Sequence, residues 1–148
     1  MQTIAIVDYG MGNVRSVQKA IEYIAPNDMC LLTNNPQVIR DSDRVVFPGQ
    51  GAMGSCMSAL ASNKLIDEIK LASKSKPFLG ICLGLQLLFD YSEENNTTKG
   101  LSIVPGKVIK FQNSELKIPH MGWNRVNQVK SHPLWHKIDN NSRFYSVH

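Results

Sequence analysis

The stretch that decides the fold runs from residue 78 to residue 89 and reads FLGICLGLQLLF. Its first half has the pattern of a buried strand and its second half that of an apolar helix. The G-x-C-x-G sequence Gly80–Gly84 falls on the turn between them and copies the G-x-S-x-G nucleophile elbow, where bulkier flanking residues would collide. The pattern predicts Cys82 as a nucleophile at a helix N-terminus, with the Leu83 N–H directed toward an oxyanion. The alternative is a buried structural cysteine in a glycine-flanked turn.

Strand-like and helix-like segments alternate around this turn. We expect strands at Thr3–Asp8, Met29–Thr33, Arg44–Phe47 and Pro77–Ile81, and helices at Asn13–Ile24, Pro36–Arg40, Ala52–Ser75 (in two segments meeting near Asn63) and Leu83–Tyr91. Strands separated by helices of this length indicate βαβ units, and therefore an α/β fold with a parallel sheet flanked by helices.

The pattern changes after the polar turn at residues 95–100. Shorter strands are expected at Gly106–Phe111, Leu116–Ile118, Arg125–Val129 and Arg143–Val147. With little helix between them, they predict an antiparallel extension of the sheet, within a single domain spanning residues 1–148. The sequence RFYSVH runs to His148 as strand material, so we expect a domain that is incomplete at its C-terminus.

Composition excludes several classes of protein. The 148 residues suit one domain, and no apolar run approaches the ~20 residues of a membrane span. The N-terminus lacks the features of a signal peptide, so we expect a cytoplasmic protein with no membrane contact. The net charge is +4, but the Lys and Arg residues are scattered along the chain, which argues against nucleic-acid binding. Three widely spaced cysteines (Cys30, Cys56, Cys82) argue against a disulfide framework or metal site, and no cofactor is expected.

A second glycine-rich stretch, FPGQGAMG at residues 47–54, contains G-x-G-x-x-G. A dinucleotide-binding fingerprint belongs to the first βα turn and needs an acidic residue at the end of the next strand. Here the pattern follows the third strand, and Asp67 and Glu68 fall inside a helix. We therefore interpret Gly49–Gly51 as a loop that offers backbone N–H groups to an anion opposite Cys82, and dinucleotide binding as the weaker alternative.

The remaining candidates lie near the C-terminus. KIPHMGWN, residues 117–124, is either a turn capped by a core tryptophan or a partner surface, since Trp and Met are enriched in interfaces. The sequence contains four histidines, none of which can be paired with Cys82 from sequence alone: His120, His132, His136 and His148.

Taken together, these motifs resemble class I glutamine amidotransferases, and most narrowly the glutaminase subunits of histidine biosynthesis. The matching motifs, in the family's order, are DYGxGN at 8–13, PGxG at 48–51, GICLGxQLLF at 80–89, SEE at 92–94, KGL at 99–101 and PHMGWN at 119–124. The resemblance implies a flavodoxin-like class I glutamine amidotransferase fold that needs no metal or cofactor.

The resemblance also implies a role for each matching residue. Cys82 would attack the side-chain amide of glutamine and release ammonia. The implied oxyanion hole is Gly49, Gln50, Gly51 and Leu83, and the implied glutamine-binding residues are Gly51, Gln86 and Glu94. The implied contacts with a (β/α)₈-barrel cyclase partner, in a heterodimer, are Asn13, Pro119, His120, Met121, Gly122, Trp123 and Asn124.

Two departures from the family qualify these roles. Gln50 stands where the family usually has Val. The family's triad His and Glu lie in a His-Pro-Glu segment that no part of these 148 residues matches, so we expect negligible glutaminase activity from these residues, even with a barrel partner. A paralogue that supplies ammonia for surface-polysaccharide sugars, and a module that only docks on a barrel, remain alternatives.

Overall fold

The computed structural model describes residues 1–112 and 117–148. The chain divides into two compact units, Met1–Lys110 and Phe111–His148, and each is described here by itself.

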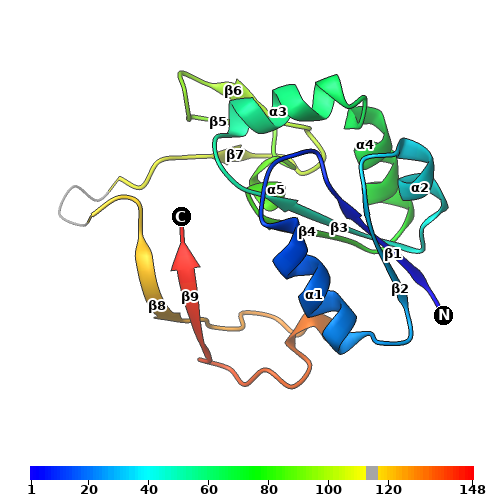
Figure 1. Ribbon diagram of the computed structural model, residues 1–148. Helices are drawn as coiled ribbons and strands as arrows, with labels where there is room; N and C mark the ends of the chain where they lie inside the picture. The colour runs from blue at the N-terminus through cyan, green and yellow to red at the C-terminus, as the bar shows by residue number, and fades with distance from the viewer. Residues whose placement is uncertain (113–116) are drawn as a thin grey trace. The chain divides into compact units, whose positions relative to one another are not determined.

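The first unit is built on a parallel sheet (Figure 1). Its strands are β1 (Thr3–Val7), β2 (Met29–Thr33), β3 (Arg44–Gly49) and β4 (Phe78–Cys82), in the order β2-β1-β3-β4. Successive side chains of β1 point to opposite faces, and Ile4, Ala5, Ile6 and Val7 are all buried. Both faces of the strand are therefore covered, which explains its uninterrupted apolar sequence.

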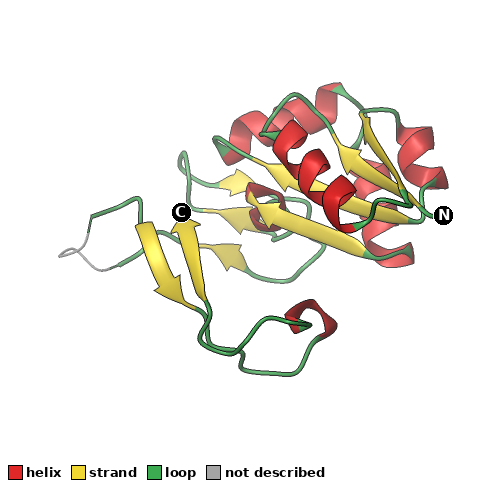
Figure 2. Ribbon diagram, turned by 60° about the horizontal axis from the view of Figure 1, so that its bottom comes forward, coloured by secondary structure: helices red, strands yellow, loops and turns green. Residues whose placement is uncertain are grey.

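Helices cover the two faces of this sheet (Figure 2). They are α1 (Val14–Ile24), α2 (Pro36–Asp41), α3 (Met53–Ser62), α4 (Ile66–Ser75) and α5 (Leu83–Gln86). On one face α1 packs Val14 against Ile4 and Ile6, and on the other Phe47 lies in a larger core with residues of α2 to α5. The predicted α/β class with a parallel sheet is confirmed, as is the division of the long helical region near Asn63.

The helix expected at Leu83–Tyr91 was predicted wrongly, because α5 ends at Gln86. The carbonyl oxygens of residues 87–89 accept hydrogen bonds from the backbone N–H groups of residues 101–103 instead of continuing the helix. Tyr91–Ser92 forms β5, which pairs with β6 (Thr98–Lys99) and β7 (Lys107–Val108) in a separate three-stranded sheet. The strand expected at Gly106–Phe111 is therefore only two residues long.

The second unit contains an antiparallel hairpin of β8 (Met121–Arg125) and β9 (Arg143–Val147), and a 3₁₀ turn, η1 (Pro133–Trp135). The strand at Arg143–Val147 is confirmed. The strand expected at Arg125–Val129 was predicted too far along the chain. The structure has it at Met121–Arg125, where it pairs residue by residue with β9. In the expected strand at Leu116–Ile118, Leu116 lies outside the described residues and the other two residues are in no strand.

The antiparallel extension expected for the large sheet was predicted wrongly: in the part of the chain that is described, the later strands form two separate small sheets, and in one of them β5 pairs with β7 in parallel. Over the same residues, no helix combines the length and the apolar composition needed to cross a bilayer.

Candidate active site

The site-forming segments of the first unit meet where the parallel strands end. The loop 8–13 follows β1, residues 50–52 follow β3, and β4 ends at Cys82. The pairing of β3 with β4 sets Gly49 directly beside Cys82. The carboxyl ends of parallel strands are the usual place for a ligand site in α/β folds. The topology therefore brings Cys82 and the Gly49–Gly51 loop together, as the sequence predicted.

Cys82 occupies the turn between β4 and α5 with φ 55° and ψ −119°. A residue with a side chain rarely adopts this conformation, which stores on the order of 1–3 kcal/mol and is typical of functional sites. The side chain is exposed. Leu83 is the first helical residue, so its N–H has no acceptor within the helix, and the parallel pairing of Gly49 with Cys82 sets this N–H beside the Gly49 carbonyl group.

The glycines of the elbow are required by close backbone packing. A Cβ on Gly84 would overlap the carbonyl oxygen of Phe47 in β3, and a Cβ on Gly49 would lie 2.6 Å from the Gly84 nitrogen. A Cβ on Gly80 would lie 3.0 Å from the Cα of Leu85. The small residues on either side of Cys82 thus allow α5 to press against β3, which is the physical reason for the G-x-C-x-G pattern.

The loop after β1 lies against the loop after β3. A Cβ on Gly12 would be 3.7 Å from the Gln50 nitrogen, and one on Gly51 would be 3.3 Å from the methyl group of Met11. These loops line an open hollow of about 610 Å³. Gln50, the departure from the family's Val, is exposed there, so its side chain does not disturb the core. Asn13 is exposed and caps α1, since its Oδ1 accepts a hydrogen bond from the Ser16 N–H.

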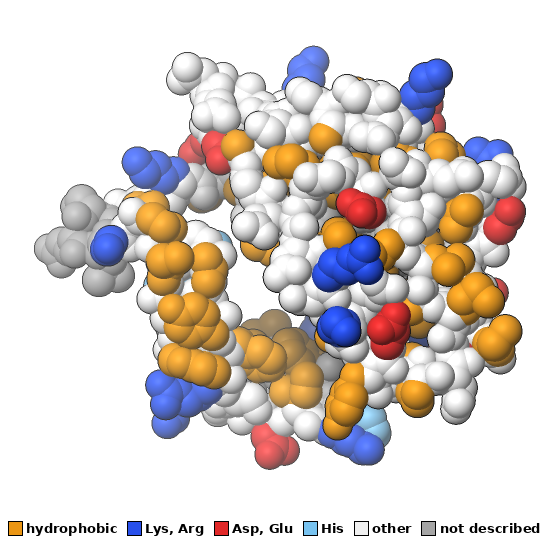
Figure 3. All heavy atoms as spheres, viewed as in Figure 1, with side chains coloured by type: hydrophobic (Ala, Val, Ile, Leu, Met, Phe, Trp, Pro, Cys, Tyr) orange, Lys and Arg blue, Asp and Glu red, His pale blue; other side chains and the backbone are white. Residues whose placement is uncertain are grey.

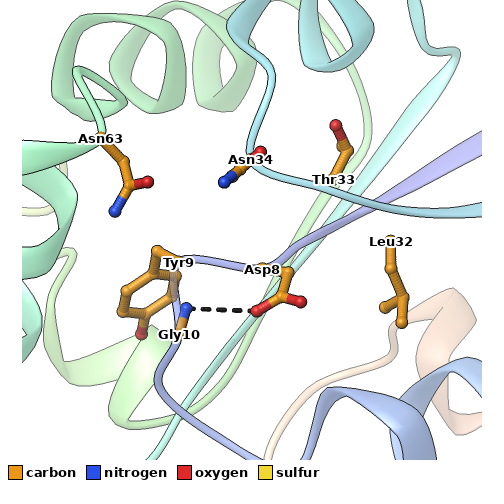
Figure 4. Close-up of a pocket in the computed structure, with 7 residues that line it drawn as sticks. All are labelled: Asp8, Tyr9, Gly10, Leu32, Thr33, Asn34 and Asn63. Atoms are coloured by element: carbon orange, nitrogen blue, oxygen red, sulfur yellow. Dashed lines mark hydrogen bonds between the residues drawn. The ribbon is translucent and has the colours of Figure 1, made fainter.

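A neighbouring hollow of about 460 Å³ lies over the ends of β1 and β2 (Figure 4). Asp8, Asn34 and Asn63 point into it from three segments, and Asp8 Oδ1 accepts a hydrogen bond from the Gly10 N–H at 3.1 Å. That bond shapes the turn at Gly10, which has φ 85°.

The two other residues assigned to glutamine binding differ in their surroundings. Gln86 is the last residue of α5, one turn after Leu83. Glu94 lies after β5, and its Oε2 accepts a hydrogen bond of 2.8 Å from the Met53 N–H at the start of α3. This contact anchors one carboxylate oxygen to a helix N-terminus, a favourable place for a negative charge. Sequence alone offered no sign of this anchor.

The hairpin of the second unit carries four of the expected partner residues: Met121, Gly122, Trp123 and Asn124. Met121 and Trp123 are 60% and 61% exposed, and they share one face of the hairpin with Tyr145 and Val147. We call these four side chains the hairpin apolar face. Figure 3 shows apolar side chains gathered along the hairpin. At one end of the hairpin, Arg125 of β8 lies opposite Arg143 of β9.

His120 and His148 pair with each other in the second unit. Their backbones exchange two hydrogen bonds, and His148 Nε2 lies 3.1 Å from His120 Nδ1. The Asn124 side chain contacts the other ring nitrogen of His120 at 2.9 Å. Pro119 precedes His120 through a cis peptide bond after Ile118. His132 and His136 are exposed and flank the half-buried Trp135. Among the residues described, no cluster of three or more His, Cys, Asp or Glu could hold a metal.

A parallel α/β sheet that presents a strained cysteine on a strand-to-helix turn is the arrangement of α/β proteins in which a thiol attacks a carbonyl group. The family model for glutamine amidotransferase class-I matches residues 5–148, and this chain belongs to that family.

Among its relatives, imidazole glycerol phosphate synthase subunit HisH from Nitrosospira multiformis is 54% identical over 156 residues, covering 100% of this chain and 73% of the relative. The subunit HisH from Nitrosomonas europaea is 53% identical over 156 residues, and the alignment again covers 100% of this chain and 73% of the relative. A crystal structure of a putative peptidase E protein from Listeria monocytogenes has a TM-score of 0.53 at 12% identity, covering 70% of this chain and 63% of that one. The last likeness supports the fold alone.

Proposed function

We propose that this chain is the glutaminase subunit of an imidazole glycerol phosphate synthase, and that it supplies ammonia to a cyclase subunit. The observation that carries the proposal is Cys82 at the strained elbow, paired in register with Gly49. The names of the relatives, at 54% and 53% identity, support this synthase over other amidotransferases. For such a biosynthetic enzyme we infer a cytoplasmic location.

In this reaction the Cys82 thiolate attacks the side-chain amide carbon of glutamine. The oxyanion that forms receives hydrogen bonds from the Leu83 N–H and from the backbone of Gly49–Gly51. The proton that the thiol gave up goes to the leaving nitrogen as the carbon–nitrogen bond breaks, so that ammonia departs. Water then hydrolyses the thioester to give glutamate and the free thiol. The family's histidine base matches no residue of this sequence, so the proposal assigns that role to none of them.

The substrate is held by Gly51, Gln86 and Glu94. Glu94 has one oxygen bound to the Met53 N–H; the second has no hydrogen-bond donor among the described residues and can accept a hydrogen bond from the α-ammonium group of glutamine. The exposed hollow beside Gly51 supplies the approach.

We assign partner contacts to Asn13 in the first unit and, in the second unit, to Pro119, His120, Met121, Gly122, Trp123 and Asn124. The support for this assignment is the hairpin apolar face, because large exposed Met and Trp side chains are typical of interfaces. A (β/α)₈-barrel cyclase is the expected partner. Changing Trp123 to Ala should weaken binding of the cyclase by roughly tenfold or more. Val129→Ala is the matched control, since Val129 is also highly exposed but lies outside this face.

The test is to purify the full-length protein with its cyclase subunit and to measure ammonia release from glutamine. Wild-type protein and the Cys30→Ala control should release ammonia, and Cys82→Ala should not. Adding the cyclase substrate should give imidazole glycerol phosphate, whereas a polysaccharide paralogue would give none. Retention of turnover in Cys82→Ala, or failure of the wild-type complex to use glutamine, would refute the proposal.

A further inference from the structure

Two buried donors contact the end of β3 and the loop that follows it from the side of the core. The Tyr9 hydroxyl donates a hydrogen bond to the Pro48 carbonyl oxygen at 3.0 Å, and the Cys56 thiol donates one to the Gln50 carbonyl oxygen at 3.4 Å. Tyr9 is 3% exposed and Cys56 is fully buried. The two carbonyl groups that receive these bonds lie on either side of Gly49.

A trans peptide group is planar, so its C=O and the N–H of the next residue point in opposite directions. A donor that holds the Pro48 carbonyl therefore also fixes the direction of the Gly49 N–H, which the pairing of Pro48 with Ile81 turns toward the Ile81 carbonyl group of β4. In the same way, Cys56 sets the direction of the Gly51 N–H through the carbonyl of Gln50. Gly51 has φ 94°, and glycine rotates with little steric resistance, so the segment needs outside contacts to keep one orientation.

The surroundings of both side chains suit a permanent donor. Burial raises the pKa of the Tyr9 hydroxyl and of the Cys56 thiol, so both groups stay protonated at neutral pH. The Tyr9 ring packs against Phe47 at a centroid separation of 5.7 Å. Its hydroxyl would lie 2.8 Å from a Cβ on Gly49, which shows how closely it approaches the segment.

We propose, as an inference that rests on the proposed function, that Tyr9 and Cys56 are positioning residues: Tyr9 holds Gly49 in its pairing beside Cys82, and Cys56 orients the Gly51 N–H toward the oxyanion. Neither side chain touches the substrate. Each acts through a carbonyl group of the segment beside Cys82, so the two should affect the stabilisation of the transition state more than the binding of glutamine.

The experiment compares Tyr9→Phe and Cys56→Ala in the full-length protein bound to its cyclase subunit. We expect kcat to fall about tenfold while KM for glutamine stays within about twofold, a smaller loss than the roughly 10²–10³-fold caused by removing an oxyanion donor outright. Cys56→Ser keeps a donor and should recover most of kcat. The rate of Cys82 alkylation by iodoacetamide, followed by mass spectrometry, should not change, because that reaction forms no oxyanion.

Matched controls are Tyr23→Phe, at an exposed tyrosine, and Cys30→Ala, at a cysteine outside this contact. Unchanged kcat in both Tyr9→Phe and Cys56→Ala, with an active wild-type enzyme, would overturn this inference alone. A parallel fall in kcat, alkylation rate and melting temperature would also overturn it, in favour of a general structural role. A wild-type complex that releases no ammonia would refute the proposed function and this inference with it.

Discussion

Replacing Gly84 by Ala tests whether the elbow depends on contact between α5 and β3. The added methyl group would overlap the carbonyl oxygen of Phe47, and it would lie 2.9 Å from the Phe47 carbonyl carbon and 3.1 Å from that of Pro48. All three are backbone atoms of a strand that is paired with β4 along its length, so they cannot move aside cheaply. The strand and the helix must therefore separate.

The size of the effect follows from two opposing contributions. Gly84 has a helical position without a positive φ, so Ala should gain about 1 kcal/mol in helix propensity. Overpacking against backbone typically costs about 1–3 kcal/mol and occasionally more. Because the overlap is severe, we expect the larger figure and a net loss of about 2 kcal/mol, equivalent to a fall in the urea midpoint of roughly 1 M.

The assay is urea unfolding followed by circular dichroism, with ammonia release measured on the same samples. Separation of α5 from β3 would move Leu83 away from Gly49, and we expect kcat to drop by about 10²-fold, the usual result of a displacement near 1 Å. Gly54→Ala is the matched control, because Gly54 also lies in a helix and a Cβ there would meet only the Thr98 side chain, at 3.7 Å. This control should be unchanged or stabilised by up to about 1 kcal/mol. A Gly84→Ala protein as stable as wild type would refute the reasoning.

Three further predictions follow from single residues. The Cys82→Gly protein should be more stable to urea than the Cys82→Ala protein by about 1 kcal/mol, since glycine tolerates the φ of 55° at this position. Equal urea midpoints for the two variants would show that the turn is unstrained. Burial raises the pKa of the Cys56 thiol, so above about pH 8.5 the thiol ionises in the unfolded chain before it ionises in the folded protein. The free energy of unfolding therefore falls as the pH rises. Cys56→Ser should show a smaller alkaline decrease in melting temperature. Glu68→Gln should lower the free energy of unfolding by about 1–2 kcal/mol, because the buried Glu68 carboxylate accepts a 3.0 Å hydrogen bond from Arg40 Nε. A change in this free energy below the error of urea titrations at low salt would contradict the prediction.

The elbow could be predicted because its requirements are local. A buried strand, a cysteine between two glycines and an apolar helix follow one another within residues 78–89, and the steric need for Gly80 and Gly84 appears in the structure as backbone contacts. The large sheet was predictable for a similar reason, since a strand covered on both faces, such as β1, must be apolar throughout.

The errors arose where non-local hydrogen bonds decide the outcome. An apolar pattern predicted that α5 would continue to Tyr91, but the carbonyl groups after Gln86 bind residues 101–103 instead. Likewise β8 lies at Met121–Arg125, because its position depends on pairing with β9 about twenty residues away.

By itself, then, the sequence determined the class of fold, the place of Cys82 on a strand-to-helix turn and the glycine loop beside it, because apolar periodicity and the size of glycine act over a few neighbouring residues. Only the tertiary structure decided that Glu94 binds the start of α3 and that Tyr9 and Cys56 hold the carbonyl groups around Gly49. Each of these contacts joins elements that are separate along the chain, and the direction of a backbone carbonyl group cannot be predicted from the residue types around it.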